Sequence, residues 1–261
     1  YSILDQHADS YRKIRNTFRY LLGNINDDFE EINLEKIDIK KLPELEQFML
    51  HKIYLLDLNF KKYFKNYDFH NLYKDLLNFC TVDLSAFYFD IRKDCLYCDS
   101  QNSKKRQSVI LLLQIILNAI LKWFAPILSF TTEEIFKLVS NKKSIHLEKF
   151  IDFPTNFKNE GLNTKWLELI KIRNICNLSI EEKRADKTLG SSLEASLKIK
   201  LNKKKLEIVK NIDLAELFIT SATYVEESND DEILVKTEKA EGVKCPVCWK
   251  ISTQSCKRHG K

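Results

Sequence analysis

The most apolar stretch of the chain is VILLLQIILNAILKWFAPIL, residues 109–128, and its length and interruptions decide what surrounds it. A run of roughly 20 apolar residues would be long enough to cross a bilayer as a helix. Gln114, Asn118 and Lys122 interrupt this run, and Pro126 removes a backbone donor near its end. The pattern therefore predicts a helix over residues 103–125 that lies in a protein core and stops at the proline.

Composition and spacing extend this prediction to most of the chain. Of the 261 residues, 44% are hydrophobic and 30% charged, and five Gly and four Pro are too few for the many turns of a β-sandwich. Apolar residues recur at helical intervals over 3–22, 43–65, 68–93 and 166–187, and Thr131 or Thr132 is expected to cap a short helix ending at 138. The expected fold class is mainly α, a helical bundle.

The periodicity of the sequence changes after residue 187. Residues 193–201 alternate between apolar and polar side chains, which is the two-residue period of a strand with one buried face. Residues 217–225 and 233–237 are further strand candidates, separated by an acidic turn. The sequence thus predicts a helical bundle at 1–160, a helix with a small α/β subdomain at 161–240, and a tail at 241–261.

Charge is distributed unevenly along the chain. The net charge of +5 is too small to establish a polyanionic partner, but the tail from residue 242 onward has five Lys or Arg and no Asp or Glu. Such a tail either attracts phosphate groups or is an ordinary solvated end. The sequence shows neither a secretory signal nor an uninterrupted membrane span, and we expect a cytoplasmic, monomeric protein without membrane contact.

The last 17 residues contain side chains spaced for a metal ion. The set is C-x2-C-x7-C-x2-H, formed by Cys245, Cys248, Cys256 and His259. Two residues separate the ligands of each pair, so that a tight turn can direct both side chains to one ion, as in tetrahedral zinc sites. Four protein ligands leave no open coordination position, which indicates a structural Zn²⁺. The alternative is a disordered tail with reduced thiols.

The other cysteines are less informative. Seven cysteines, an odd number, do not suggest a disulfide framework in a chain without a secretory signal. Cys95 and Cys98 have the same spacing as the tail pairs and could complete a four-cysteine site with the first of them, although closure within the tail is simpler. Cys80 and Cys176 lie among apolar residues and are expected in the core.

Two groups of residues have side chains suited to nucleic acid. Trp249 follows the second cysteine of the tail among lysines, where an unstacked base could lie on its ring, or where the ring could pack over the metal turn. Arg12, Arg15 and Arg19 form a row along the helix predicted at 3–22. Such a row either contacts phosphates or is the solvated face of an amphipathic helix.

Five segments resemble the isoleucyl-tRNA synthetase family of bacterial type, in the order in which that family has them. They are YRKIRNTFRYLLGN (11–24), YDFHNLYKDLLNFCTVDLSAFYFDIRKDCLYC (67–98), WFAPILSFTTEEIF (123–136), EEKRADKTLGSSLEA (181–195) and KCPVCW (244–249). The first is similar to the opening helix of the family's anticodon-binding domain. Valyl- and leucyl-tRNA synthetases share this type of bundle, but KTLGSSLEA before a strand unit and KCPVCW resemble the isoleucyl enzymes.

The resemblance implies the C-terminal part of a class I synthetase: an anticodon-binding helical bundle, a small α/β subdomain and a zinc-binding tail. The whole enzyme of that family attaches isoleucine to its tRNA with ATP, in catalytic and editing domains upstream of such a segment. This chain has no HIGH-like tetrad and no KMSKS-like loop, so we expect no catalytic residue and no activity of the chain alone. The expected partner is isoleucine tRNA, bound by Arg12, Arg15, Arg19, Trp249, Lys250, Lys257 and Arg258.

The tail departs from the family's pattern at two points. Where the family commonly has Arg before the second cysteine, this chain has Val247, so a base contact there is lost or comes from Lys250 or Arg258. The family often closes a longer insert with C-x2-C, whereas here His259 is a ligand inferred from spacing. Two alternatives stay open: a valyl-, leucyl- or methionyl-tRNA synthetase, and a freestanding zinc-ribbon helical protein that binds RNA.

Overall fold

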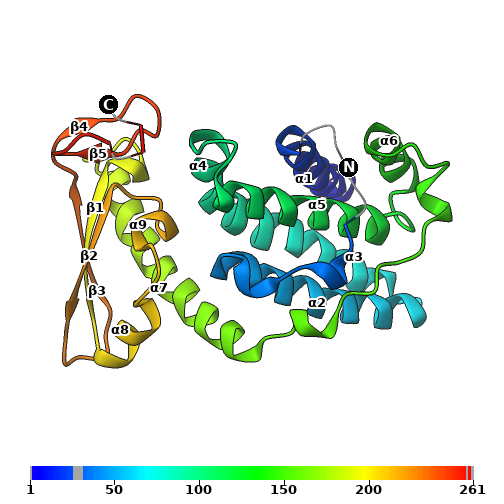
Figure 1. The fold of residues 1–261 in the computed structure, drawn as a ribbon, viewed down its shortest axis with the longest axis horizontal. Coiled ribbons are helices and arrows are strands. Elements are labelled where there is room, and N and C mark those ends of the chain that lie inside the picture. Colours follow the sequence, from blue (N-terminus) through cyan, green and yellow to red (C-terminus); the bar gives the residue numbers. More distant parts are fainter. Residues whose placement is uncertain (1, 26–31, 257, 260–261) are drawn as a thin grey trace. The chain divides into compact units, whose positions relative to one another are not determined.

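The computed structural model describes residues 2–25, 32–256 and 258–259. The chain divides into two compact units, Tyr1–Asn159 and Glu160–Lys261. The first unit consists of helices, and the second contains one long helix and a small sheet (Figure 1). The separate tail domain at 241–261 stays a prediction.

The first unit is a bundle of helices, as the helical spacing of its apolar residues predicts. Its long helices are α1 (Ser2–Asn24), α2 (Glu44–Lys65) and α5 (Lys104–Phe124). Between α2 and α5 the chain is helical almost without interruption, through α3 (Phe69–Asn78), the π-helix η3 (Phe79–Phe89) and α4 (Asp90–Cys98). The remaining elements are α6 (Ser129–Val139), η1 (Leu34–Lys36), η2 (Ile39–Lys41), η4 (Ile145–Leu147) and η5 (Thr155–Phe157).

Helix α5 lies at the centre of this bundle, where it contacts α1, α2, α3, α4 and α6. Of its 21 residues, 11 are buried, and Phe124 packs edge to face on Phe18 of α1 with ring centroids 6.1 Å apart. By length and composition α5 is able to cross a membrane, and 61% of its apolar window is buried inside the protein. The Ser103 hydroxyl caps its first turn, and the helix ends two residues before Pro126, which cannot donate a backbone hydrogen bond.

A buried ion pair joins α2 to α4. The Arg92 guanidinium donates from Nε and Nη2 to the two carboxylate oxygens of Glu46, at 2.7 and 2.8 Å, and the Tyr88 hydroxyl donates to the same carboxylate at 3.0 Å. Glu46 and Tyr88 have no exposed surface, and Arg92 is 3% exposed. Both charges are therefore satisfied by hydrogen bonds in the place where desolvation would otherwise be most costly.

Two boundaries in the first unit differ from the prediction. Helix α6 begins at Ser129, so Thr131 and Thr132 lie inside the helix and do not cap it; the Thr132 hydroxyl donates to the Leu128 carbonyl at 3.1 Å. The one or two helices predicted to end near Asp94 continue to Cys98, because Cys95 and the following leucine still face the core.

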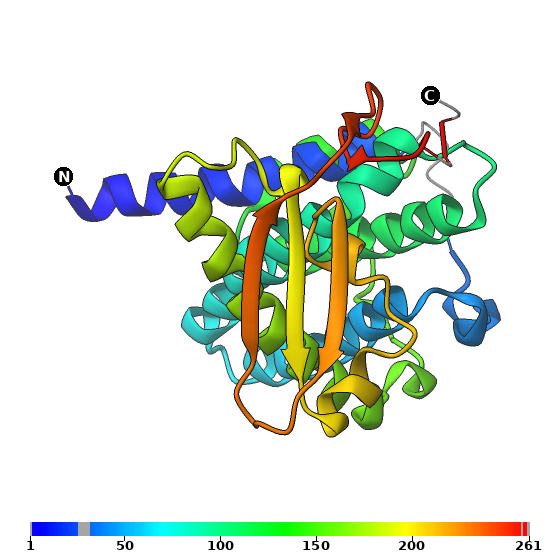
Figure 2. The same cartoon turned by 90° about the vertical axis from the view of Figure 1, so that its left-hand side faces the viewer.

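The second unit contains the long helix α7 (Glu160–Ala185) and a three-stranded sheet. The strands are β1 (Ala195–Leu201), β2 (Ala222–Glu227) and β3 (Leu234–Lys239), with β1 in the middle, parallel to β2 and antiparallel to β3 (Figure 2). Helix α7 contacts β3. The predicted alternation of β1 is confirmed, because its buried residues are Ala195, Leu197, Ile199 and Leu201.

Short elements between the strands correct the prediction for this unit. The strand expected at 217–225 begins only at residue 222, because α9 (Leu214–Leu217) comes first and Ile219 turns the chain with a φ of 58°. Asp213 caps α9 by accepting the backbone N–H of Glu216 at 3.0 Å. Helix α8 (Lys203–Val209) and the single turn η6 (Ser192–Glu194) were not predicted, since neither is long enough to establish a period.

The buried ion pair leads to a prediction about stability. Arg92→Met should lower the free energy of unfolding by about 3–5 kcal/mol, because the Glu46 carboxylate stays buried without its partner. Urea denaturation followed by circular dichroism measures the loss. The matched control is Lys93→Met in the neighbouring pair with Asp90, 2.6 Å apart and partly exposed, which should cost less than about 1 kcal/mol. Equal losses in the two variants would contradict the prediction.

Candidate metal centre and nucleic-acid interface

The tail is a small hairpin that folds around its cysteines. Strands β4 (Val243–Lys244) and β5 (Ile251–Ser252) pair antiparallel, and the turn between them contains the first two cysteines. The backbone N–H of Trp249 donates to the Cys245 carbonyl at 3.0 Å, and the N–H of Cys245 donates to the Lys250 carbonyl at 2.9 Å. Gly242 begins the hairpin with a φ of 118°, and a Cβ there would lie 2.1 Å from the Ser252 carbonyl oxygen, so only glycine fits.

The four donor atoms predicted from spacing lie together. The Sγ atoms of Cys245, Cys248 and Cys256 and the ring nitrogen of His259 are all within 4.8 Å of one another. His259 Nδ1 is 3.5 Å from Cys245 Sγ and 3.3 Å from Cys256 Sγ, and Cys248 Sγ is 3.9 Å from Cys256 Sγ. Tetrahedral bonds to zinc require separations of about 3.6 Å between sulfur and nitrogen and about 3.8 Å between sulfurs. The donor set therefore fits a tetrahedral Zn²⁺.

The turn also prepares one thiol for ionisation. Backbone N–H groups of Cys248 and Val247 lower the pKa of the Cys245 thiol to about 6. Burial has the opposite effect on Cys248 and raises the pKa of its thiol to about 11. The thiolate is the form that binds metal, and burial disfavours the thiolate of Cys248. A cation at the centre would stabilise this thiolate and so lower the pKa of the Cys248 thiol.

Three residues of the tail that were predicted to bind tRNA, Trp249, Lys250 and Arg258, lie beside this cluster. Trp249 is 59% exposed and has a left-handed backbone with a φ of 63°, so the turn points a large ring outward. Lys250 and Arg258 line a groove of about 660 Å³ beside the ligand cluster. Lys257 lies outside the described residues. The arrangement can hold an aromatic plane and cations at one surface, as binding of unpaired bases requires.

The three arginines predicted on α1 have different surroundings. Arg12 pairs with Asp9 at 2.5 Å, and Arg15 makes two parallel bonds to the Glu134 carboxylate of α6, at 3.0 and 3.1 Å. The hydrogen bonds from Arg15 lower the pKa of Glu134. Arg19 is exposed and makes no ion pair with any residue that the structure describes. Of the three, Arg19 is therefore the cation most available to a phosphate.

All three arginines line one groove between α1 and α6. Its volume is about 630 Å³, and its other residues include Asn16, Leu22, Glu134 and Leu138. The Tyr11 hydroxyl shares a hydrogen bond of 2.9 Å with Thr131 and receives one of 3.3 Å from Arg15, so both helices hold the wall of the groove in place. The groove thus combines three cationic side chains with apolar ones.

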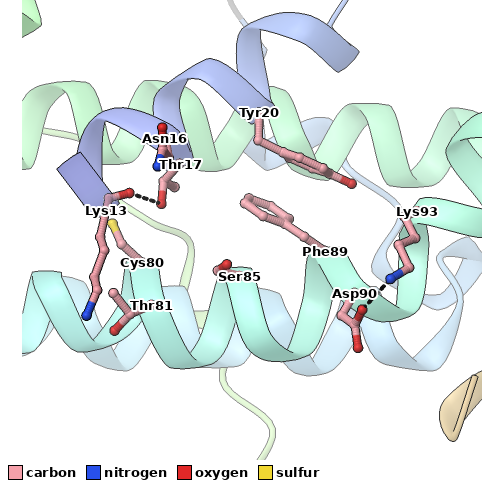
Figure 3. Close-up of a pocket in the computed structure, with 10 residues that line it drawn as sticks. All are labelled: Lys13, Asn16, Thr17, Tyr20, Cys80, Thr81, Ser85, Phe89, Asp90 and Lys93. Carbon is pink, nitrogen blue, oxygen red and sulfur yellow. Dashed lines mark hydrogen bonds and ion pairs between the residues drawn. The ribbon is translucent and has the colours of Figure 1, made fainter. Parts of the chain in front are cut away.

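A second groove follows the other flank of α1, and sequence reasoning missed it. It lies between α1 and the π-helix η3, with a volume of about 550 Å³, and Figure 3 shows its walls. Tyr20 of α1 stacks on Phe89 with ring centroids 4.2 Å apart and an interplanar angle of 19°. The Tyr20 hydroxyl is buried without a well-formed hydrogen bond to the described residues, and burial raises its pKa. Lys13, Ser85 and Lys93 also line this groove.

A signal for this groove was present in the sequence. Lys13, Asn16, Thr17 and Tyr20 are spaced i, i+3, i+4 and i+7, which places them on one face of a helix. The opposite wall carried no comparable signal. Cys80, Ser85 and Asp90 line that wall at intervals of five residues, the offset between hydrogen-bonded residues in a π-helix, and local periodicity does not predict π-helices.

Comparison with known proteins agrees with this geometry. The family described as the anticodon-binding domain of tRNA ligase matches residues 46–201. The isoleucine–tRNA ligase of Pelagibacter ubique (strain HTCC1062) is 68% identical over 260 residues, covering 99% of this chain and 29% of the relative. Those of Brachyspira hyodysenteriae (strain ATCC 49526 / WA1) and Agrobacterium fabrum (strain C58 / ATCC 33970) are 41% and 37% identical, over 93% and 97% of this chain.

The chain spans 27–29% of the length of these relatives. The predicted resemblance to isoleucyl-tRNA synthetases is confirmed, since these proteins match the chain almost from end to end. The family match covers more than half of the chain, from the buried ion pair of α2 to the middle strand of the sheet. The chain belongs to the family of anticodon-binding domains of tRNA ligases.

Proposed function

We propose that this chain recognises isoleucine tRNA as part of an isoleucyl-tRNA synthetase. Catalytic and editing domains of the same polypeptide would use ATP to attach the amino acid, and this chain would supply none of the catalytic residues. The observation that carries the proposal is the pair of grooves on either flank of α1, one lined by three arginines and one by stacked aromatic rings. We expect the protein to act as a cytoplasmic monomer.

The two grooves suit different parts of an RNA loop. Cations that contact the phosphate backbone of the RNA supply affinity, and Arg19 is exposed and can make such a contact. An unstacked base needs an aromatic face and polar groups at its edge, which Tyr20, Ser85 and Lys13 provide in the groove beside the π-helix (Figure 3). Asn16 lines both grooves and lies between them on α1. The bundle therefore suits an anticodon stem and loop.

The tail is proposed to hold a structural Zn²⁺ on Cys245, Cys248, Cys256 and His259. With four protein ligands the ion would leave no position for a reacting water, so its contribution is folding free energy. A hairpin with two-residue strands buries too little apolar surface to be stable alone. The ion would hold Trp249, Lys250 and Arg258 in one arrangement at the surface, with Lys257 as a further cation.

The choice among tRNAs separates this proposal from its alternatives. Filter binding of the chain to purified isoleucine, valine, leucine and methionine tRNAs measures the preference. Tighter binding of isoleucine tRNA supports the proposal, and tighter binding of another of these tRNAs would assign the chain to that synthetase. Equal binding of all four and of an unrelated hairpin RNA would favour a freestanding zinc-ribbon RNA-binding protein.

The metal proposal predicts the outcome of a ligand substitution. Cys248→Ala should release zinc while the bundle stays folded, because the bundle has its own core around α5. Elemental analysis of the purified protein should find one zinc per wild-type chain and none in the variant. Cys95→Ala is the matched control, since Cys95 is buried in the first unit and should leave the zinc content unchanged. Loss of zinc in both variants, or zinc-free wild type, would refute the assignment.

The stacking role of Trp249 can be tested in the same protein. Trp249→Ala should weaken binding of isoleucine tRNA about tenfold, because loss of one base stack costs about 1–3 kcal/mol. Gel shifts with intact tRNA, and with a minihelix that lacks the anticodon arm, measure the change, and zinc analysis confirms that the turn is intact. The minihelix should bind both proteins equally. Unchanged affinity for intact tRNA with zinc retained would make Trp249 a packing residue.

The groove beside the π-helix predicts a difference between two neighbouring substitutions. Ser85→Trp fills the groove and should weaken binding of the anticodon stem-loop by about tenfold, the value expected for one lost base stack. Val82→Trp is the matched control, because Val82 is 52% exposed on the same π-helix but does not line the groove. Fluorescence anisotropy with a labelled stem-loop measures both affinities. If Ser85→Trp and Val82→Trp bind the stem-loop with equal affinity, no base occupies this groove.

A further inference from the structure

The segment before β1 reaches the metal-binding hairpin through a single carboxylate. Glu194 Oε2 accepts the backbone N–H of Gly190 at 3.1 Å, which holds the side chain in place. Its other oxygen lies 3.7 Å from the Lys244 ammonium of β4. The Glu194 side chain is 20% exposed and that of Lys244 is 49% exposed, so the pair is partly shielded from water. Glu194 thus fixes the position of a cation on the hairpin.

Lys244 makes a second contact, with the proposed stacking residue. Its Nζ lies over the Trp249 ring, 5.8 Å from the ring centroid. A cation at this distance is attracted to the face of an indole, and the attraction orients the ring relative to the cation. Glu194, Lys244 and Trp249 therefore form a chain of contacts from a turn of the second unit to the exposed aromatic ring.

A hydroxyl group ties the backbone of the same two segments together. Ser221 donates to the Leu193 carbonyl at 2.5 Å and accepts the backbone N–H of Ile251, in β5, at 2.6 Å. Both capacities of the hydroxyl are used, so the hairpin is held beside residue 193 independently of any charge. Because the backbone is already held, the contact between Lys244 and Glu194 orders side chains alone. The side chain of Trp249, which Lys244 also contacts, is the last of these.

We infer that Glu194 is a positioning residue for tRNA recognition: it holds Lys244 over one face of Trp249 and so presents the ring for stacking. The inference rests on the proposed function, in which Trp249 receives a base. It assigns a recognition role to a carboxylate, the one kind of side chain that phosphate groups repel. Charge alone gives the opposite expectation, because removing a carboxylate near RNA strengthens attraction for the backbone.

The inference and the charge argument predict opposite changes in tRNA affinity when the carboxylate is removed, and this difference provides the test. Glu194→Gln should weaken binding of the isoleucine tRNA anticodon stem-loop by about two- to fivefold, the range of an exposed cation–π contact. Glu238→Gln is the matched control: Glu238 also pairs with lysines, Lys198 at 3.0 Å and Lys236 at 2.6 Å, on the same sheet, and the change of charge is identical. This control should bind equally or more tightly. Lys244→Arg, which keeps both contacts, should bind like wild type.

A spectroscopic measurement reports on the ring itself. The chain has three tryptophans, so 5-fluorotryptophan labelling gives three ¹⁹F signals, and Trp249→Phe identifies the signal of Trp249. Glu194→Gln and Lys244→Gln should shift or broaden that signal, while Glu238→Gln and Lys244→Arg leave it unchanged. Trp123 and Trp166 are buried, and their signals show that each variant is folded.

The outcomes distinguish a failure of the inference about Glu194 from a failure of the proposed role of Trp249 in tRNA binding. Weaker binding and an altered Trp249 signal in Glu194→Gln alone among the carboxylate variants support the inference. Equal behaviour of Glu194→Gln and Glu238→Gln overturns it, and so does an altered ring signal without a change in affinity. If wild type does not bind the stem-loop, or if Trp249→Ala binds it normally, the proposed function of the tail fails instead.

Discussion

The burial of α5 is the constraint on which the first unit depends. A helix that is apolar on most sides has to be surrounded, and α5 contacts five other helices. Because α1 contributes only one buried stripe to this packing, with Ile14, Phe18 and Leu21, its remaining surface is free to carry polar residues. The positions of the two grooves therefore follow from core packing. One lies between α1 and α6 and the other between α1 and η3, beside the stripe of α1 that is buried in the core.

The tail solves a different physical problem. Its strands have two residues each, so its order would come from the proposed metal held by Cys245, Cys248, Cys256 and His259 and from a few contacts with the turn before β1. Trp249, in a left-handed turn of this hairpin, is exposed next to Lys244 and close to the proposed metal.

Under the proposed function, recognition of tRNA would combine long-range attraction with contacts that depend on the placement of aromatic rings. Arg19 would act through attraction to phosphate charge, which weakens as salt screens it. Stacking of a base on Tyr20 or Trp249 would depend on the orientation of the ring, which its contacts with Phe89 or Lys244 restrict. The ion pairs of Arg15 with Glu134 and of Lys244 with Glu194 show how carboxylates occupy a cationic surface: each holds one basic side chain in a defined place.

The sequence by itself determined the features that depend on the spacing of neighbouring residues: the core helix α5, the alternation of β1 and the spacing of the proposed metal ligands in the tail. These follow from local chemistry, because a period of 3.6 or 2 residues and a two-residue gap between ligands are properties of neighbouring residues. Only the tertiary structure decided that Arg15 pairs with a residue 119 positions away, that Tyr20 lies on Phe89, and that Glu194 reaches Lys244. Contacts between distant segments depend on how whole helices and strands pack, and no local period encodes that packing.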